Sequence, residues 1–491
     1  MKGLKSPFFY EIMGRTMKGQ TKKTIISGVL ILSLVGFAHA DLARRIDSVI
    51  SQSLQDGVKF SIHVVKADTG NSAYSHDAKE PLIPASNMKI VTAAAALRYL
   101  GADFEYKTKV GLCGNTLVII GSGDPLLGDE QTDSKYGRQE GWIFKDITEK
   151  LKHDDITAIG DIIVDTGVFD NECVHPSWPA AELNRSYACE VSGLNYNLNC
   201  IKLSARNIGG RVSISIEPQT SFVTLINEVK PISRGDSSLG TYRNSQPNRI
   251  KVYGECKNED GPIEVAIEKP AAFFGYLLFE HLTEASIQTK GQFIEKVLED
   301  TNDFNLIAEY KTTMNDCLAR CLKDSLNLGA EAFMKTIAAV NNPDKKHGSW
   351  DRGRELIGKY LSGLGIDKDR FNIDDGCGLS RENRLSAEII TKVLLDVYNS
   401  DNWNMYRDSL AIGGVDGTSS IADNFKEEKY KGKVLGKSGY ISGVKSLSGV
   451  CLTAKGDYIF SIIANNANGL NRMVINDIAQ AIIDDADNGQ N

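Results

Sequence analysis

Ser86 and Lys89 are the first residues in the chain whose types and spacing could do chemistry. They lie in residues 84–89, Pro-Ala-Ser-Asn-Met-Lys, shortly before a run of four alanines. Alanine favours a helix and Pro84 marks its start, so we expect a helix to begin near Ser86 and to end at Gly101. Residues three apart share one helix face. An amine beside a hydroxyl on a rigid helix can activate the serine as a nucleophile.

The Ser-x-x-Lys pattern is weak evidence by itself, because serine and lysine are common residues. A chain of this length is expected to contain roughly two such matches by chance. A second match, Ser-Gly-Val-Lys, does occur at residues 442–445. It lies in a β-like context with no helix behind it, so we interpret Ser442 as a chance match. Catalysis by Ser86 therefore needs support from other residues.

Two further motifs follow Ser86 in the chain. Ser325-Leu326-Asn327 lies between two helical stretches and is expected to project from a loop. Lys437-Ser438-Gly439 ends a β-like run, where the glycine would let a ligand backbone approach closely. Alone, each tripeptide is more often a helix cap or an exposed strand end, so only their combination is informative.

The segments that must position these motifs are of two kinds. The start of the mature chain alternates helix, strand and turn, whereas residues 105–268 contain short apolar or alternating runs separated by glycine and asparagine, typical of β-structure. From about residue 269 the chain favours helices, and its end favours two strands and a last helix. The expected boundaries are 1–40 for a signal peptide, 41–104 and 269–491 for two parts of a catalytic domain, and 105–268 for one or two inserted β-rich domains.

The N-terminus is typical of a secretory signal peptide. Three lysines between residues 18 and 23 precede an apolar run at 24–38, and Ala38-His39-Ala40 has the small-x-small pattern of a cleavage site. We expect cleavage after Ala40 and a periplasmic protein. The alternative is an uncleaved anchor, although a run of about fifteen residues is shorter than the roughly 20 that a membrane span needs. Met17 would give a conventional start.

Composition and charge exclude several classes of protein. The chain has 491 residues, 42% hydrophobic and 24% charged, which suits a soluble protein of two or three domains. Its formal net charge is −7, and removal of residues 1–40 makes it more acidic. An acidic exported protein is a poor candidate for binding nucleic acid or anionic membranes.

The cysteines indicate neither a metal site nor a fixed disulfide framework. There are nine, none in a Cys-x-x-Cys pair and none beside a histidine-rich cluster, so zinc is not expected. Disulfides are compatible with export. Because nine is odd, at least one thiol has no intramolecular partner, and the sequence leaves the pairing open.

In this order and context, the three motifs together resemble those of penicillin-recognising serine acyl transferases. The separation of 239 residues from Ser86 to Ser325, mostly the β-rich insertion, makes the chain similar to class C low-molecular-mass penicillin-binding proteins, the D-alanyl-D-alanine carboxypeptidase/endopeptidase family. Compact serine β-lactamases lack such an insertion. Secondary signatures extend the resemblance over roughly residues 41–483; they lie at 121–125, 160–165, 191–197, 375–383 and 414–418.

The resemblance implies an α/β, multi-domain fold. Its core would be a transpeptidase domain of the penicillin-binding-protein/β-lactamase type, with an antiparallel sheet and helices, interrupted by β-rich insertions. The implied function is a serine-type D-Ala-D-Ala carboxypeptidase, with endopeptidase activity as an option, that cleaves peptidoglycan stem peptides and is inhibited by β-lactams. It needs no cofactor. The alternatives are a β-lactamase and a non-hydrolytic penicillin-binding sensor or scaffold; the oligomeric state stays open.

Residue roles also follow from the resemblance. Ser86 would attack the substrate carbonyl, and Lys89 would have to be neutral to take its proton, which burial and a nearby Lys437 charge would favour. Ser325 would relay the proton to the leaving amine. The remaining implied contacts are with substrate: Asn327 binds its amide and holds Lys89, Lys437 and Ser438 receive its terminal carboxylate, Gly439 admits its backbone, and the N–H groups of Ser86 and Tyr440 form the oxyanion hole.

Three residues depart from the family pattern. Ser438 replaces the usual threonine but keeps its hydroxyl, so substrate binding should survive. Cys377 replaces the serine of an Asp-Gly-Ser-Gly loop. Tyr440 replaces a small hydroxyl residue, so its backbone N–H is kept while one side-chain contact to substrate is lost.

Overall fold

The computed structural model describes residues 41–487 except 53–56, 300–302 and 344–346. The predicted signal peptide, residues 1–40, lies outside the described residues. Over the described part of the chain, no helix combines the length and apolar character that crossing a membrane requires. All nine cysteines lie in this part, and all nine are free thiols.

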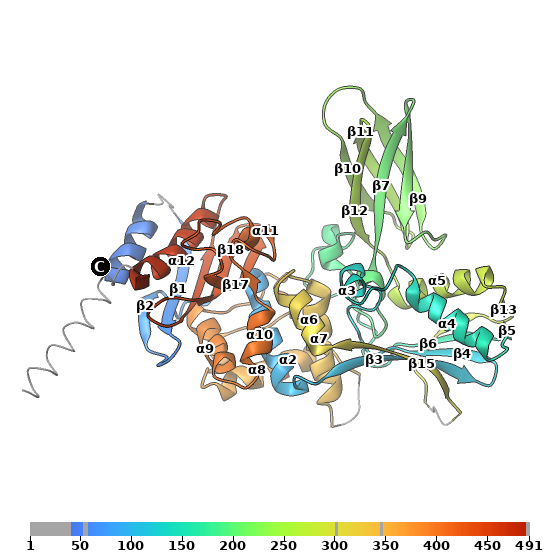
Figure 1. The fold of residues 1–491 in the computed structure, drawn as a ribbon, viewed down its shortest axis with the longest axis horizontal. Coiled ribbons are helices and arrows are strands. Elements are labelled where there is room, and N and C mark those ends of the chain that lie inside the picture. Colours follow the sequence, from blue (N-terminus) through green and yellow to red (C-terminus); the bar gives the residue numbers. More distant parts are fainter. Residues whose placement is uncertain (1–40, 53–56, 300–302, 344–346, 488–491) are drawn as a thin grey trace, which may run out of the picture.

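A six-stranded antiparallel sheet joins the two ends of the chain (Figure 1). The strand order is β16-β17-β18-β19-β1-β2, so the N-terminal hairpin pairs with the last strand through β1 and β19. Both faces of β1 are covered, because Ile62 and Val64 lie in one hydrophobic cluster and Val65 lies in another. The strands are β1 (Lys59–Lys66), β2 (Ser72–His76), β16 (Ala411–Ile412), β17 (Val434–Ile441), β18 (Val444–Cys451) and β19 (Tyr458–Asn465).

Helix α2 (Met88–Leu100) is the central helix of this part of the molecule. It packs against α6, α7, α8 and α9, and its residues 88–97 are all buried. The alanines at 93–96 have small side chains, which lets the surrounding helices approach closely. The other helices here are α6 (Met314–Leu322), α7 (Asn327–Val340), α8 (Trp350–Gly363), α9 (Ala387–Tyr398), α10 (Trp403–Asp408), α11 (Ser419–Ala422) and α12 (Asn471–Asp487).

The middle of the chain forms separate sheets beside this unit, with their own hydrophobic cluster. A five-stranded sheet has the order β14-β6-β4-β3-β15, and two three-stranded sheets project away from it (Figure 1). The strands are β3 (Glu105–Cys113), β4 (Thr116–Ile120), β5 (Ala158–Ile159), β6 (Ile162–Asp165), β7 (Cys200–Ile208), β8 (Arg211–Glu217), β9 (Thr224–Pro231), β10 (Ser238–Arg243), β11 (Arg249–Cys256), β12 (Glu259–Ala266), β13 (Gln288–Thr289), β14 (Phe293–Glu295) and β15 (Asn305–Thr313).

Short and amphipathic helices accompany these sheets. Helix α5 packs against α4, and both contribute apolar side chains to the second cluster. The helices are α3 (Glu130–Lys135), α4 (Trp142–His153) and α5 (Pro270–Glu284), and the 3-10 turns of the described residues are η1 (Ala85–Asn87), η2 (Ala180–Glu182), η3 (Ser186–Ala188), η4 (Asn197–Asn199) and η5 (Lys368–Arg370).

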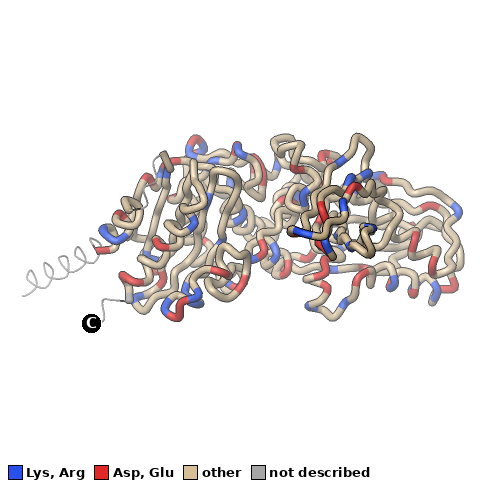
Figure 2. The backbone as a smooth tube through the Cα atoms, turned by 90° about the horizontal axis from the view of Figure 1, so that it is seen from above, with Lys and Arg blue, Asp and Glu red and all other residues tan. Residues whose placement is uncertain are grey.

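Basic and acidic residues are interspersed along the backbone (Figure 2).

Residues that follow position 268 pack with the middle of the chain. Strand β15 pairs antiparallel with β3 along its whole length, so the five-stranded sheet is complete only at Thr313. Helix α5 likewise packs with α4 and not with α2. The partner of β15 lies far away in the sequence, and a local sequence pattern does not indicate such a partner.

Candidate active site

Ser86 lies in the 3-10 turn η1, which leads directly into α2. The preceding residue, Ala85, has a φ of 48°, a left-handed conformation that is costly for a residue with a Cβ. This sharp turn brings the half-buried Ser86 to the start of the helix, as the sequence predicted, although in a 3-10 turn and not in the α-helix itself.

The Lys89 amine is fully buried and has three oxygen neighbours. Its Nζ donates to Ser86 Oγ at 3.1 Å, to Asn327 Oδ1 at 2.6 Å and to the Cys377 backbone oxygen at 2.8 Å. Two of the oxygens therefore hold the nitrogen in place and the third is the serine hydroxyl.

The buried Lys437 and the half-buried Ser325 form a second pair next to the first. Lys437 Nζ donates to Ser325 Oγ at 2.8 Å and to the Ser438 backbone oxygen at 2.7 Å. Ser325 has a φ of 64°, so its backbone is also held in the left-handed region. Burial, assisted by the positive charge of Lys89, lowers the pKa of Lys437 well below its usual range. The site therefore disfavours the charged form of Lys437.

Gly439 is required by the close approach of β17 to η1. A Cβ at this position would lie 2.2 Å from Ser446 Oγ and 3.0 Å from both Pro84 O and Ser86 N. Strand β16 pairs only with residues 435 and 436 of β17. From Lys437 onward, this edge of β17 has no strand partner in the part of the chain that the structure describes. The exposed Tyr440 continues the same open edge.

An inserted segment also contributes to the site. The Asn327 Nδ2 atom donates to the backbone oxygen of Tyr187, in η3, at 2.6 Å. The amide of Asn327 is thus fixed at both ends, by Lys89 and by Tyr187. Sequence reasoning missed Tyr187 because the contact uses a backbone oxygen 140 residues away, which no side-chain motif signals.

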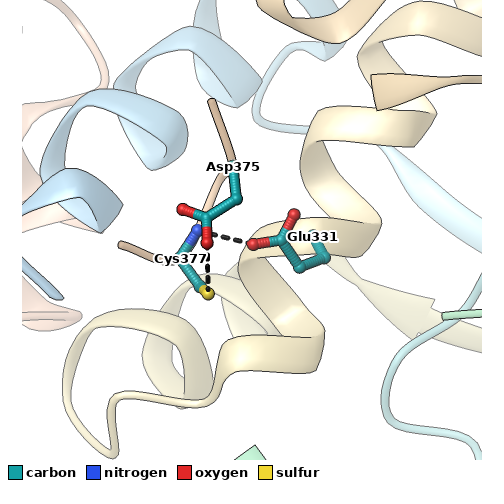
Figure 3. A group of neighbouring side chains, drawn as sticks. All are labelled: Glu331, Asp375 and Cys377. Carbon is teal, nitrogen blue, oxygen red and sulfur yellow. Dashed lines mark hydrogen bonds between the residues drawn. The ribbon is translucent and has the colours of Figure 1, made fainter. Parts of the chain in front are cut away.

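A buried carboxylate pair holds the loop that carries Cys377 (Figure 3). Glu331 lies on α7 one turn after Asn327 and accepts from the N–H groups of Gly376 at 3.1 Å and Cys377 at 2.7 Å, and from the Trp350 indole at 2.7 Å. Asp375 accepts from the loop residues that follow it and from Trp178. Burial, and then repulsion from Asp375, raise the pKa of Glu331.

Glu331, Asp375 and Cys377 are close enough to one another to hold a metal ion. However, the carboxylate oxygens already accept N–H groups, and the Cys377 thiol points to Asp375 at 3.6 Å. This set suits a pair of hydrogen-bonded carboxyl groups that hold the loop, and none of their oxygens that accept these N–H groups is left to face a common cation. We therefore interpret it as the support that places the Cys377 carbonyl against Lys89.

Substitution of Glu331 by glutamine tests this support. Glu331→Gln would place an amide NH₂ against a backbone N–H of the loop, so we expect the free energy of unfolding to fall by about 1–3 kcal/mol. Displacement of the Cys377 carbonyl should also slow acylation by penicillin. Chemical denaturation and the time course of adduct formation measure the two effects. Glu355→Gln, on the exposed face of α8, should change neither; an unaltered Glu331→Gln variant would contradict the interpretation.

A serine hydroxyl and a buried lysine amine at the start of one helix, beside an antiparallel sheet with an open edge, define the class of penicillin-recognising serine hydrolases. The comparison with known families narrows this class. The chain belongs to the D-Ala-D-Ala carboxypeptidase 3 (S13) family, whose model matches residues 42–487. The family and the enzyme class predicted from the sequence are therefore confirmed.

Individual relatives support the assignment over nearly the whole chain. The chain is 28% identical over 468 residues to the D-alanyl-D-alanine carboxypeptidase of Actinomadura sp. (strain R39), covering 90% of this chain and 84% of that protein. Penicillin-binding protein 4 (dacB) from Haemophilus influenzae is similar in structure, with a TM-score of 0.74, 22% identity and coverage of 89% and 98%.

Two further solved structures share the fold. The same Haemophilus influenzae protein complexed with a β-lactam gives a TM-score of 0.69, with 21% identity and coverage of 89% and 98%. A predatory endopeptidase from Bdellovibrio bacteriovorus, in complex with an immunity protein, gives 0.52, with 16% identity and coverage of 87% and 94%. These similarities confirm the predicted fold class, a penicillin-binding-protein-like unit with additional sheets.

Proposed function

We propose that the chain is an exported serine D-Ala-D-Ala carboxypeptidase that cleaves peptidoglycan stem peptides with Ser86 as nucleophile. The observation that carries this proposal is the position of the Lys89 amine, 3.1 Å from Ser86 Oγ and fixed by Asn327 and by the Cys377 carbonyl. A base held within hydrogen-bond distance of a hydroxyl, and oriented by further groups, is the arrangement that activates a serine.

The reaction follows from these positions. Ser86 Oγ attacks the carbonyl carbon of the D-Ala-D-Ala bond while its proton passes to Lys89, a step that requires the Lys89 amine to be uncharged. The N–H groups of Ser86 and Tyr440 stabilise the resulting oxyanion, a contribution of about 3 kcal/mol per donor in comparable enzymes. Ser325 then delivers the proton to the leaving amine, and D-alanine departs. Water then attacks the acyl-enzyme, the proton transfers run in the opposite direction, and Ser86 is released.

The open edge of β17 supports an extended peptide as substrate. Backbone groups of an unpaired strand edge can hydrogen-bond to an added strand. A peptide lying there would bring its C-terminal carboxylate to Lys437 and Ser438, and its penultimate amide to Asn327. A charged carboxylate gains most from such charge-assisted hydrogen bonds. A free C-terminus is therefore part of what the site recognises.

The domain organisation and the location belong to the same proposal. Residues 41–104 and 314–487 would form the catalytic domain, and residues 105–313 one or more inserted domains. The signal-peptide pattern of residues 1–40 and the family membership support an exported, periplasmic protein. β-Lactams would acylate Ser86 because the carboxylate and the reactive amide of a β-lactam imitate those of the substrate.

An endopeptidase activity is the second candidate, supported by the fold shared with the Bdellovibrio bacteriovorus endopeptidase. The experiment offers the enzyme a pentapeptide ending in D-Ala-D-Ala and, separately, a cross-linked peptide dimer. We expect release of D-alanine from the first. Cleavage of the dimer at a higher kcat/KM would favour the endopeptidase. Covalent labelling by penicillin with no release from either substrate would contradict both and identify a sensor.

A further inference from the structure

Thr418 lies beside the proposed carboxylate site, in the connection between β16 and β17. Its Oγ1 is 3.0 Å from the Oγ of Ser438. Thr418 precedes the short helix α11 in the N-cap position, where a threonine side chain commonly caps the helix. Here its side chain makes no capping hydrogen bond. The hydroxyl is instead directed at Ser438, so helix capping does not explain it.

The segment that carries Thr418 is held by contacts on two sides. Asp416 accepts from Lys323 Nζ at 2.8 Å and from the Ile412 N–H at 2.8 Å. Gly417 has a φ of +88°, and a Cβ there would lie 2.3 Å from the Cβ of Ala411. These contacts tie the segment to β16 and to the chain that leads into Ser325. Thr418 is thus presented by a fixed backbone.

Ser438 needs an external contact of this kind. A serine hydroxyl can occupy several rotamers, whereas the β-branched threonine is restricted at χ1. The backbone oxygen of Ser438 is already engaged by Lys437, but its hydroxyl has a described partner only in Thr418. If Thr418 donates to Ser438 Oγ, the proton of Ser438 is left free to point into the site.

We propose that Thr418 is a positioning residue that orients the Ser438 hydroxyl toward the C-terminal carboxylate of the substrate. The inference rests on the proposed function, because the proposed function places the substrate carboxylate at Lys437 and Ser438. Thr418 acts through Ser438 and does not itself take part in bond making. Its contribution is therefore confined to ligands that carry the carboxylate.

The test compares Thr418→Val, which removes the hydroxyl at constant shape, with Thr418→Ser, which keeps it. For a peptide ending in D-Ala-D-Ala, we expect Thr418→Val to lower kcat/KM about 5-fold through KM, the loss of about one net hydrogen bond. Thr418→Ser should retain most of the wild-type kcat/KM, because it keeps the hydroxyl. With the same peptide amidated at its C-terminus, wild type and Thr418→Val should be equal, since the carboxylate is missing.

A double substitution supplies the second readout. In Thr418→Val/Ser438→Thr, the added γ-methyl group should fix the rotamer that Thr418 no longer fixes, and kcat/KM should rise above that of Thr418→Val. An equal loss with the amidated peptide, or no loss at all, would overturn the inference. Thermal unfolding of each variant identifies a loss that comes from misfolding.

The rate of acylation by penicillin, which also carries a carboxylate, separates this inference from the proposed function. If wild type is acylated but releases no D-alanine, the proposed function fails. The inference then stands or falls with a roughly 5-fold slower acylation of Thr418→Val. If wild type is not acylated at all, both fail.

Discussion

Replacement of Ser86 by alanine is expected to lower kcat for D-alanine release by about 10⁶-fold, the loss seen when the nucleophile of a serine hydrolase is removed. The variant should fold normally, because the half-buried Ser86 hydroxyl only accepts a hydrogen bond from Lys89 and alanine fills almost the same volume. Release of D-alanine from a pentapeptide, followed with a coupled assay, measures the effect.

Ser442→Ala is the matched control. It removes the serine of the second Ser-x-x-Lys match, which lies exposed in the turn between β17 and β18. Its activity should equal that of the wild type. A Ser86→Ala variant with more than about one hundredth of the wild-type kcat would show that another group supplies the nucleophile, since that loss is far smaller than nucleophile removal causes.

Replacement of Lys89 by methionine should give the second-largest effect. Methionine fills the space of the lysine stem but cannot accept the proton of Ser86, so we expect the rate of acylation by penicillin to fall about 10³- to 10⁴-fold, at the upper end of general-base contributions. Substrate binding should change little, because Lys437 and Ser438 are untouched. Pre-steady-state mass measurement of the adduct gives the rate directly.

Lys335→Met controls for the removal of a buried lysine. Lys335 is also fully buried and pairs with Asp170 and with the backbone oxygen of Glu172, on the same helix as Asn327 but away from Ser86. This variant should lose stability while its acylation rate stays near that of the wild type. Similar acylation rates for the two variants would mean that Lys89 has a structural role and is not the base.

Much of the fold could be predicted because long periodic segments carry local information. Helices α5 to α12 follow residue 269, where the chain was expected to favour helices, and strands β18 and β19 with helix α12 form the two strands and last helix expected at its end. The pairing of β1 with β19 is not local, nor is that of β3 with β15, so neither pairing could be predicted from a sequence pattern. Periodicity identifies a strand but not its partner.

The proposed site also contains residues that the sequence predicts and residues that it does not. Ser86, Asn327 and Lys437 could be named from the sequence because motifs record side chains, and the structure brings the three motifs together. The backbone oxygens of Tyr187 and Cys377 could not be named, because any residue type can supply a carbonyl. The signatures at 375–383 and 414–418 include Cys377 and Thr418, but the sequence indicated no role for either residue in the site. The catalytic and substrate-binding roles themselves stay predictions.

The location of the penicillin adduct tests most directly whether Ser86 is the nucleophile. The protein is incubated with penicillin, digested and sequenced by mass spectrometry. We expect one adduct per chain, on Ser86, absent from Ser86→Ala and present in Ser442→Ala. An adduct on any other residue, or one that persists in Ser86→Ala, would contradict the assignment of Ser86 as the nucleophile.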